Sequence, residues 1–452
     1  MAKKKQIELT IEEKLQNALV PKEEQPYKIP NNWCWVRLES INKYKSETLN
    51  PKNAMEKMFE LYSVPSFDNK YPEILIGKDI GSNKYIVKKN DILLCKINPR
   101  INRVWQVYQH TNFGQICSSE WIVIRNEILN KSFLRYYFTS EYFRNRLCEN
   151  VSGVGGSLTR AKPKLVQLYE VPLSPINEQQ RIVNIIESLF AKLDRAKELI
   201  ENTLAQWEQN KMAILHKAFT GELTVKWRKE NNIDLSSWQE KTIDELCTSL
   251  KYGTSKKSKP EGSVVVLRMG NLQSGEIDWS NLMYTDDKDD IEKYLLKKGD
   301  VLFNRTNSPE LVGKTSIYRG EYPAIYAGYL IKLDYGKDII GEYLNYMMNS
   351  TKAKHYCYTV KTDGVSQSNI NAKKIGAFEI PVPTIEEQQE IVNILDRLLA
   401  KYNKIKNLEQ QLEKIELLKK AILAKAFRGE LGTNNPDEES AENLLKEILA
   451  EK

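Results

Sequence analysis

Two long stretches of the chain place apolar residues at alternating spacings of four and three, the pattern of a helix with one apolar stripe. In the stretch from residue 176 to about 220 the stripe comprises positions 182, 186, 189, 193, 196, 200, 203, 207, 210 and 214, with Thr203 and Asn210 as polar members. In residues 385–428 it comprises Ile391, Leu395, Leu398, Tyr402, Ile405, Leu408, Leu412, Ile415, Leu418 and Ile422. Neither stretch contains Pro or Gly. The pattern therefore predicts two helices of about 45 residues, each roughly 65 Å long.

Residues at both ends of these stretches favour helix boundaries. Ser174-Pro175 is a suitable N-cap and first-turn pair, and Thr384 with Glu387 has the spacing of a capping box. Gly221 and Gly429 follow the stretches, where a left-handed residue ends a helix. Because a narrow stripe needs a partner helix, we expect the two helices to pair antiparallel, with one globular domain at either end. A coiled-coil dimerisation device without a spacing role remains the alternative.

The chain also repeats itself. PLSPINEQQRIVNIIESLFAKLD (172–194) matches PVPTIEEQQEIVNILDRLLAKYN (381–403) at an offset of 209 residues, and KMAILHKAFTGELT (211–224) matches KKAILAKAFRGELG (419–432). The segments before each repeat are more weakly alike: KKNDILLCK (88–96) parallels KKGDVLFNR (297–305), and FLRYYFTS (133–140) parallels YLNYMMNS (343–350). A shared framework with different loops indicates one scaffold carried twice, in which each copy recognises a different target.

The segments before each long helix have the pattern of mixed α/β domains. Short β-rich runs occur at 73–77, 85–96, 263–271 and 300–306, and helical patches at 130–149 and 338–354. The predicted fold is therefore α/β, with two mixed domains separated by two long antiparallel helices and related by an internal pseudo-two-fold repeat.

Composition narrows the class of protein. The 452 residues are 41% hydrophobic and 28% charged, which is typical of a globular chain with more than one core. No run of 18 apolar residues occurs, and the lysines at the N-terminus are not followed by an apolar segment. The six cysteines form no CxxC pair. We therefore expect a cytoplasmic protein with reduced thiols and no membrane partner.

Charge is uneven along the chain. Residues 31–170 contain 21 Lys and Arg against 13 Asp and Glu, whereas residues 238–380 contain 20 against 19. The first domain is thus basic enough to indicate a polyanion partner, while the second gives no such indication from its net charge.

Motifs for catalysis are missing. The sequence has no Asn/Asp-Pro-Pro-aromatic tetrad of an adenine methyltransferase; Asn98-Pro99-Arg100 lacks the second Pro and the aromatic. Gly313-Lys314-Thr315 lacks the earlier glycine of a phosphate loop, since Ser308 stands there. The three histidines are far apart in sequence, and one His355–Cys357 pair does not make a zinc site. We predict a chain without catalytic activity, cofactor or metal of its own.

The repeated motifs carry a family resemblance. IPNNWCWVRLESI (29–41) and the paired NEQQ-type helix start and KAFxGEL helix end resemble the specificity (S) subunits of type I restriction–modification enzymes over nearly the whole chain. The resemblance implies two target recognition domains, each recognising half of a split, asymmetric site in double-stranded DNA, and helices that fix the gap between the half-sites. It implies as partners two modification (M) methyltransferase subunits, docked on the helices, and restriction (R) subunits. S-adenosylmethionine, ATP and magnesium would be held by those partners.

The resemblance also sets the expected organisation. The segments EEKLQNALVPKEEQPY (12–27) and ESAENLLKEILAEK (439–452) are both short and helix-prone, and such termini help to close these subunits into a pseudo-symmetric ring. We therefore expect an N-terminal helical segment, first recognition domain, central helix, second recognition domain, distal helix and helical tail at residues 1–28, 29–171, 172–224, 225–380, 381–432 and 433–452.

Candidate DNA contacts are loops in which Arg, Lys, Asn, Gln, Ser and Thr cluster beside the repeated framework. In the first domain they are Lys96, Asn98, Arg100, Asn102, Arg103, Thr159, Arg160, Lys162 and Lys164. In the second they are Asn304, Arg305, Thr306, Asn307, Lys314, Ser366, Gln367, Ser368 and Asn369. Arg can bridge guanine and Asn or Gln adenine, whereas Lys and Ser more often hold phosphates. Two other functions remain open: a duplicated coiled-coil scaffold that binds proteins, and a stand-alone DNA-modifying enzyme with unrecognised motifs.

Overall fold

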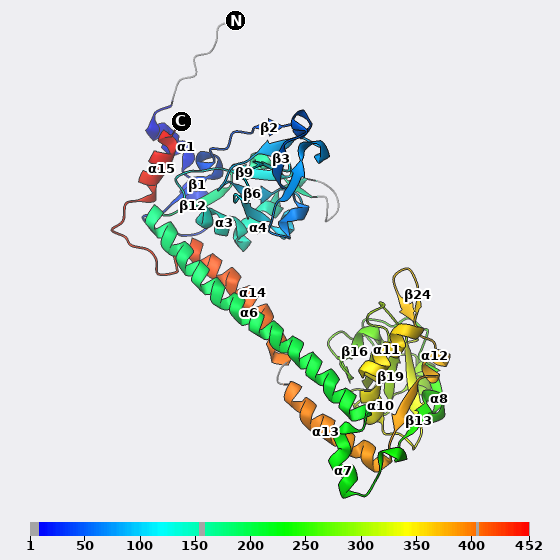
Figure 1. The fold of residues 1–452 in the computed structure, drawn as a ribbon. Coiled ribbons are helices and arrows are strands. Elements are labelled where there is room, and N and C mark those ends of the chain that lie inside the picture. The colour runs from blue at the N-terminus through cyan, green and yellow to red at the C-terminus, as the bar shows by residue number, and fades with distance from the viewer. Residues whose placement is uncertain (1–8, 153–158, 404–405, 452) are drawn as a thin grey trace. The chain divides into compact units, whose positions relative to one another are not determined.

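The chain folds as two compact units, each made from a mixed α/β domain and parts of the long helices. Unit 1 comprises Met1–Glu198 and Gln411–Lys452, and unit 2 comprises Leu199–Gln410. The computed structural model describes residues 9–152, 159–403 and 406–451 (Figure 1). The central long helix is α6 (Ile176–Phe219), as the sequence predicts. The distal stretch is described as α13 (Ile385–Asn403) and α14 (Lys406–Phe427), and the stripe position Ile405 lies outside the described residues.

Unit 1 contains two main sheets and a set of shorter helices. Besides α6 and α14, its helices are α1 (Ile11–Ala18), α2 (Leu38–Ile41), α3 (Lys131–Thr139), α4 (Glu141–Glu149), α5 (Pro163–Val166) and α15 (Ala441–Ala450). Its strands are β1 (Cys34–Arg37), β2 (Thr48–Leu49), β3 (Met58–Tyr62), β4 (Glu73–Ile76), β5 (Lys84–Ile86), β6 (Ile92–Cys95), β7 (Val104–Gln106), β8 (Gly114–Cys117), β9 (Trp121–Ile124), β10 (Val151–Ser152), β11 (Arg160–Ala161) and β12 (Glu170–Leu173). They form sheets in the orders β2-β5-β8-β3-β4, β7-β6-β9, β1-β12 and β10-β11.

Unit 2 is built on the same plan. Besides parts of the long helices it contains α7 (Val225–Glu230), α8 (Ile243–Leu246), α9 (Lys288–Tyr294), α10 (Gly341–Met348), α11 (Thr351–Val360) and α12 (Ala372–Gly376). Its strands are β13 (Gln239–Thr242), β14 (Cys247–Tyr252), β15 (Val264–Leu267), β16 (Leu272–Gln273), β17 (Glu276–Ile277), β18 (Tyr284–Thr285), β19 (Val301–Asn304), β20 (Thr306–Asn307), β21 (Thr315–Ile317), β22 (Ala324–Tyr326), β23 (Leu330–Tyr335), β24 (Thr362–Asp363), β25 (Ser368–Asn369) and β26 (Glu379–Val382). The sheet orders are β14-β23-β19-β21, β18-β15-β22, β20-β25-β24, β13-β26 and β16-β17.

The two units repeat the same strand pairings, so the internal repeat predicted from the sequence is confirmed. Strand β6 lies between β7 and β9, and β19 lies between β21 and β23. Each unit also has a parallel pair in a second sheet, β3 with β8 and β15 with β22. In each unit a strand that directly follows a tryptophan, Trp33 or Trp238, pairs with the strand that leads into the long helix, β1 with β12 and β13 with β26.

The central strands β6 and β19 are buried at every position because both of their faces are covered. Ile92 and Leu94 of β6 belong to the core that includes α3 and α4, while Leu93 and Cys95 belong to the core around Trp105. Side chains alternate between the two faces of a strand, so each face receives two of them. Strand β19 is divided in the same way between two cores of unit 2.

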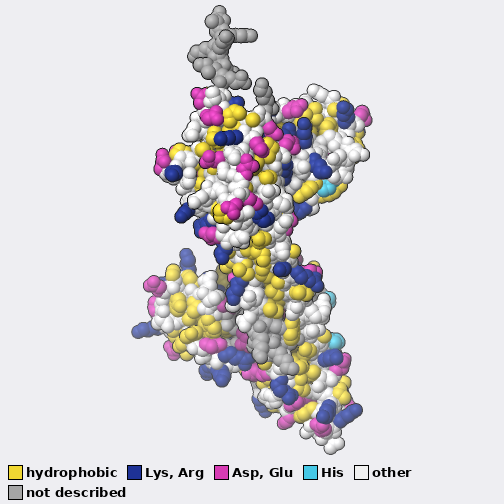
Figure 2. All heavy atoms as spheres, turned by 90° about the vertical axis from the view of Figure 1, so that its left-hand side faces the viewer, with side chains coloured by type: hydrophobic (Ala, Val, Ile, Leu, Met, Phe, Trp, Pro, Cys, Tyr) yellow, Lys and Arg dark blue, Asp and Glu magenta, His cyan; other side chains and the backbone are white. Residues whose placement is uncertain are grey.

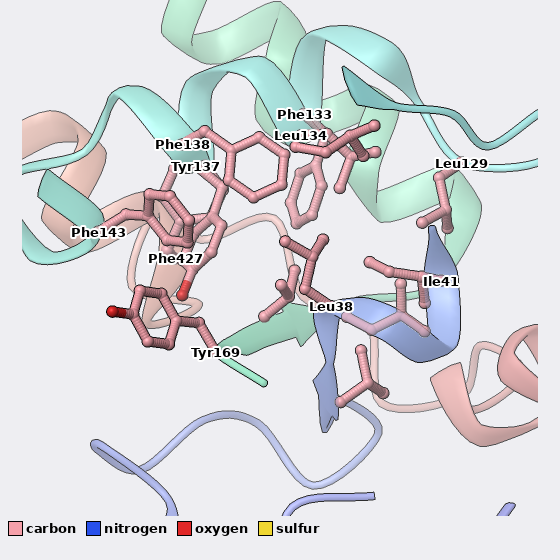
Figure 3. Packing of buried hydrophobic residues seen from close by; sticks show 14 of the residues in the cluster. Leu38, Ile41, Leu129, Phe133, Leu134, Tyr137, Phe138, Phe143, Tyr169 and Phe427 are labelled. Carbon is pink, nitrogen blue, oxygen red and sulfur yellow. The ribbon is translucent and has the colours of Figure 1, made fainter. Parts of the chain in front are cut away.

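The end of α14 closes the larger core of unit 1. Phe427 packs edge-to-face against Phe133 and Tyr137 of α3, with both ring centroids 5.2 Å away, and Figure 3 shows it among these aromatic side chains. Such contacts bury a large apolar area and add directional ring interactions. The distal helix is thereby fixed to the first domain by its last residue.

The glutamines of the repeated motif attach each domain to the start of its long helix. Gln179 Oε1 accepts from the backbone N of Asn130, the N-cap of α3, at 3.0 Å. Gln388 Oε1 accepts from the backbone N of Ile340, which caps α10, at 2.9 Å. Both glutamines are fully buried and also donate to a backbone carbonyl just before their own helix. The first and second domains are therefore held by the same side chain in the same way.

Within unit 1 the long helices pair antiparallel. Lys197 Nζ lies 3.1 Å from Glu416 Oε1, and Asp194 Oδ1 lies 2.5 Å from Lys419 Nζ. Moving back along α6 thus means moving forward along α14. Within unit 2, Thr224, which follows the end of α6, donates to Glu387 near the start of α13, and Leu204 and Leu399 line one cleft, so the direction is again antiparallel.

The stripe on α6 does not keep the register that the sequence predicts. Thr203 and Asn210 are exposed, whereas Leu204 and Lys211 are half-buried. On α14, likewise, Leu418 is 50% exposed. A straight helix has 3.6 residues per turn, so a strict spacing of 3.5 drifts off the packed face within two to three heptads. The drift thus removes the polar positions Thr203 and Asn210 and the apolar position Leu418 from the packed face.

Two predicted helix caps also differ in detail. The hydroxyl of Ser174 is buried and has no hydrogen-bond partner in the described part of the chain, so it does not cap α6. Thr384 Oγ1 does accept from Glu387 N at 3.3 Å, but the Glu387 carboxylate does not return to Thr384. It binds other side chains instead, so the capping box is only half formed. Gly221 and Gly429 have φ of 79° and 73°, as predicted for residues that end a helix.

The first and the last described helices, α1 and α15, meet within unit 1. Helix α1 packs against α15, and Ala441 N donates to the carbonyl of Asn32 at 2.9 Å. Both helices are short and amphipathic, and neither could bury its apolar face alone. Their pairing joins the N-terminal segment to the segment that follows α14 (Figure 1).

Candidate DNA interface

In each domain the candidate residues begin at the end of the central strand. The turn before that strand contains a left-handed residue, Asn90 with φ of 75° in unit 1 and Gly299 with φ of 95° in unit 2. Glycine and asparagine are the residues that adopt this conformation most easily. The strand that follows, β6 or β19, is buried, and the first residue after β6 and after β19 is Lys96 and Arg305 respectively. The framework thus delivers a cation to the same point in both domains.

The structure brings the two candidate segments of the first domain together. Asn98 N donates to the carbonyl of Thr159 at 2.8 Å, and Ala161 N donates to the carbonyl of Lys96 at 2.8 Å. Residues 96–98 and 159–161 therefore lie side by side as an extended pair, although 60 positions of chain separate them in the printed sequence.

The loop after Lys96 is held in a fixed shape. Asn98 and Asn102 both have φ of 50° and bracket a short turn that contains Arg100. Asn102 Nδ2 donates to the carbonyl of Phe138 on α3 at 2.9 Å, which ties the loop to the core. Arg100 is exposed, and its Nε lies 3.3 Å from Asn98 Oδ1. The loop thus presents Arg100 outward from a braced backbone.

The other basic candidates of the first domain differ in exposure. Lys162 and Lys164 are exposed, while Arg103 is half-buried with an Nε that has no hydrogen-bond partner among the described residues. Arg160 Nε lies 3.3 Å from Glu120 Oε2. Lys96 lies at the edge of a surface hollow of about 290 Å³. This part of the candidate interface therefore combines exposed lysines with arginines that are half-buried or paired with a carboxylate.

In the second domain the candidates form a small sheet of their own. Strand β20 pairs with β25, and β25 pairs with β24, so that Thr306 lies opposite Asn369 and Asn307 opposite Ser368. Asn369 Nδ2 also donates to Thr306 Oγ1 at 2.8 Å. Residues from 304–307 and from 366–369 are therefore neighbours, as in the first domain.

Arg305 is the centre of this cluster. Its Nη2 donates to Asn369 Oδ1 at 3.1 Å, and its guanidinium carbon lies 4.9 Å from the ring centre of Tyr252. The Nε is buried and has no hydrogen-bond partner in the described part of the chain. A stacked guanidinium is held in one plane, which suits bidentate recognition of a base or a phosphate.

Three candidates of the second domain are buried rather than exposed. Asn304 and Ser368 are 0% exposed, and Thr306 is 9% exposed. The backbone N of Asn304 donates to the carbonyl of Lys314 at 2.8 Å. The Ser368 hydroxyl donates to Asp363. These buried side chains shape the surface from beneath, whereas Ser366 and Gln367 are exposed on it. Lys314 Nζ donates to Gln273 Oε1 at 2.8 Å.

Sequence reasoning missed several residues that the fold brings beside Arg305. The carbonyl of Gly328 lies 3.5 Å from Arg305 Nη1, and Tyr329 beside it is 51% exposed. Gly328 N donates to Thr254 O at 2.7 Å, which places the loop with the exposed residues Lys256, Lys257 and Lys259 next to the cluster. The run TSKKSKP was visible in the sequence, but only the folded sheet puts it near residue 305.

On the face drawn in Figure 2, Lys and Arg side chains are interspersed with Asp and Glu. Among the described residues no group of three His, Cys, Asp or Glu side chains could hold a metal ion. No helix in the described ranges is long and apolar enough to cross a membrane. The candidate residues can therefore supply hydrogen bonds and, through Lys and Arg, positive charge.

Comparison with known proteins assigns this architecture. The family model of the type I restriction modification DNA specificity domain matches residues 30–205 and 236–417. The chain is 29% identical over 401 residues to the type I restriction enzyme EcoKI specificity subunit of Escherichia coli (strain K12), covering 84% of each chain. It is 27% identical over 358 residues to the StySPI specificity subunit of Salmonella potsdam, covering 75% of each.

Solved structures share the fold. A chain from a study of complex assembly and conformational transition of the type I R-M system superimposes with a TM-score of 0.70 at 22% identity, covering 90% of this chain and 100% of that one. The HsdS subunit from Thermoanaerobacter tengcongensis gives a TM-score of 0.51 at 23% identity, with the same coverage.

Proposed function

Because the chain belongs to the type I restriction modification DNA specificity family, we propose that its two α/β domains each recognise one half of a bipartite, asymmetric site in double-stranded DNA. The observation that carries this function is the repeated framework with divergent polar loops. Lys96 and Arg305 follow equivalent strands, yet their neighbours differ in residue type and in hydrogen bonding. Identical frames with different surfaces suit two different half-sites.

The recognition domains are proposed as residues 29–171 and 225–380, flanked by a helical segment at 1–28 and a helical tail at 433–452. The helical segments at 172–224 and 381–432 fix the gap between the two half-sites. A site read on one face of a duplex repeats about every 34 Å, so a rigid element of defined length is required for both halves to be bound together.

We assign the direct contacts to the exposed members of the candidate set. In the first domain these include Arg100, Lys162 and Lys164, and in the second Ser366 and Gln367. Half-buried Arg305 and Lys96 lie at the edge of the framework and add a base contact and a phosphate contact, respectively. The buried members, Asn304 and Ser368 among them, hold the loops in place.

The chain itself is the non-catalytic component of its enzyme. Two methyltransferase subunits dock on the helical segments and methylate adenine in each half-site with S-adenosylmethionine, and restriction subunits add the ATP- and magnesium-dependent nuclease. Leu199, Leu417 and Leu418 of the long helices are at least half exposed, which supports docking of a partner there. The assembly acts on DNA in the cytoplasm. Family membership favours this function over a protein-binding scaffold or a stand-alone modifying enzyme.

The test is to express the chain with the methyltransferase encoded beside it and to map methylated adenines in host DNA by single-molecule sequencing. We expect one split motif with a fixed gap. Replacing residues 225–380 with the corresponding domain of another family member should change one half of the motif and leave the other half and the gap unchanged. Methylation without sequence preference, or by the chain alone, would contradict the proposal.

A further inference from the structure

The most exposed apolar side chain of the second domain stands at the tip of the β24–β25 hairpin. Val365 has a relative exposure of 110%, more than the reference value for an extended chain. It lies between Gly364 and Ser366, in the tip that also carries the candidate residue Gln367. Within the described part of the chain no packing contact accounts for a branched apolar residue at this position, because its side chain is fully exposed.

The hairpin that carries Val365 is braced. Gly364 N donates to the carbonyl of Gln367 at 2.8 Å, which closes the tip. A Cβ on Gly364 would lie 3.0 Å from that carbonyl oxygen, so any side chain at this position would crowd the turn. At the base, Lys374 Nζ donates to Thr362 Oγ1 at 2.7 Å. Val365 is therefore held at the end of a defined support.

The carboxylate nearest the tip is neutralised. Asp363 accepts from Lys361 Nζ at 2.5 and 2.7 Å and from the Ser368 hydroxyl, and these donors hold the pKa of its carboxyl below the usual range. An unpaired carboxylate here would repel a phosphate backbone. With the charge compensated, the hairpin can approach a polyanion.

The hairpin is also continuous with the recognition cluster. Strand β25 pairs with β20, and Asn369 at its end accepts from Arg305 at 3.1 Å. Hairpin tips usually carry Gly, Asn, Asp or Ser, which favour the turn and remain hydrated. A valine in this place instead offers two methyl groups to whatever the cluster meets. In the major groove of DNA the one apolar group on a base edge is the 5-methyl group of thymine.

We propose that Val365 is a specificity-determining residue of the second domain, and that it contacts the 5-methyl group of a thymine in the half-site that this domain recognises. The inference rests on the proposed function, since it names a base contact made by the same surface. The adjacent polar side chains, Ser366 and Gln367, provide the hydrogen bonds at the same tip, and Val365 adds a contact that only an A·T pair with its methyl group satisfies.

The experiment removes that methyl group alone. In a duplex carrying the mapped site, each thymine of the second half-site is replaced in turn by 2′-deoxyuridine, and binding by the complex of this chain with its methyltransferase subunits is measured. A half-site with an adenine target contains at least one thymine on the opposite strand. We expect one replacement to weaken binding about three- to fivefold, the effect of one methyl group that no longer leaves water.

The variant Val365→Ser completes a cycle. It should bind the thymine duplex about as weakly as the unaltered complex binds the uracil duplex, and replacement of thymine by uracil should then change nothing further. The matched control is Val225→Ser, the same change at a valine that is 42% exposed on α7, outside the candidate cluster. It should retain both the affinity and the sensitivity to uracil.

Three outcomes would overturn the role of Val365. One is that no thymine of this half-site is sensitive to uracil, and another is that Val365→Ser keeps the sensitivity. The third is that Val365→Ser weakens binding equally on both duplexes, as expected of a side chain wedged between base pairs rather than one touching a methyl group. In each case the unaltered complex still prefers its site. Loss of that preference in the unaltered complex would instead contradict the proposed function.

Discussion

Each unit buries a glutamate at the start of a long helix, and the two units satisfy this carboxylate with different hydrogen-bond donors. Glu178 and Glu387 occupy matching places in the repeat, and both are 0% exposed. Glu387 accepts from Trp238, Thr224 and Arg228, with Arg228 Nη1 2.6 Å away. The donors to Glu178 are Trp33 at 2.7 Å, Thr433 at 3.0 Å and Asn434 at 3.0 Å, all neutral.

The difference comes from the segments that follow each helix end. In unit 2 the chain continues into α7, which supplies Arg228. In unit 1 the chain continues through Thr433 and Asn434 towards α15. The nearby arginine in this unit, Arg181 of α6, pairs with Glu438 at 2.7 Å and not with Glu178. The repeated framework thus keeps the carboxylate and the tryptophan, while the connecting segments determine how the buried charge is compensated.

The largest effect should come from removing the charge of Glu387. Glu387→Gln leaves Arg228, whose side chain is 8% exposed, without its anion, so unit 2 should lose about 3–5 kcal/mol of stability. Glu178→Gln removes hydrogen-bond strength but strands no cation, so unit 1 should lose only about 1–2 kcal/mol. Hydrogen exchange of peptides from each unit measures the two losses separately, which a single unfolding curve of a chain with two units would not.

The control for this pair is Arg228→Met combined with Glu387→Gln. It removes both charges, so part of the stability of unit 2 should return. Equal losses for the two single variants would mean that Arg228 contributes no more than a neutral donor, and the comparison would be broken.

A smaller difference is expected at the two glycines that end the long helices. A Cβ on Gly429 would lie 2.3 Å from Cγ of Pro30, a rigid ring, whereas a Cβ on Gly221 would lie 2.5 Å from Cδ1 of Leu235, an exposed and flexible side chain. Gly429→Ala should therefore destabilise unit 1 by about 2–4 kcal/mol, through backbone strain and overpacking together. A Cβ on Gly221 would also lie 3.2 Å from Arg228 Nη1, but this too is the far end of a side chain, so Gly221→Ala should lose mostly the conformational part, about 1–2 kcal/mol in unit 2.

Gly432 provides the control for the strain alone. Its φ is 71°, and a Cβ there would meet nothing within 4 Å. Gly432→Ala should match Gly221→Ala in size when each is measured by hydrogen exchange of its own unit. If Gly429→Ala were no worse than Gly432→Ala, the contact with Pro30 would have no energetic weight.

The smallest effects separate the two cations that follow the central strands. Arg305 is stacked and bridged to Asn369, so Arg305→Ala should reduce specific binding by about 1–3 kcal/mol and relax the preference at one base pair. Lys96→Ala should weaken binding to all sequences alike and lower the dependence on salt by about one ion. Titrations of specific and unrelated duplexes at several salt concentrations distinguish these results. An unchanged site preference in Arg305→Ala would remove it from the base contacts.

Much of the architecture could be predicted because it depends on local sequence patterns. The repeat, the central helix, the apolar strands and the helix-ending glycines depend on residue type and spacing within short windows. The candidate segments were located for the same reason, since they follow a repeated strand. The roles of the individual candidates could not be predicted. Asn304 and Ser368 are polar residues of the kind found at surfaces, yet they are buried. Tyr252 and Tyr329 come close to Arg305 only because the sheet brings their strands together.

The sequence by itself determined that this is a doubled chain of the specificity family, with two α/β domains and long helices that begin at a Glu-Gln-Gln motif. The tertiary structure decided which face of each helix is packed, which donors compensate each buried glutamate, and which loops share a surface. The physical reason is the sequence distance over which each interaction acts. Helix and strand propensity act between residues a few positions apart, whereas burial and charge pairing depend on neighbours such as Glu387 and Arg228, which lie far apart along the chain and meet only when it folds.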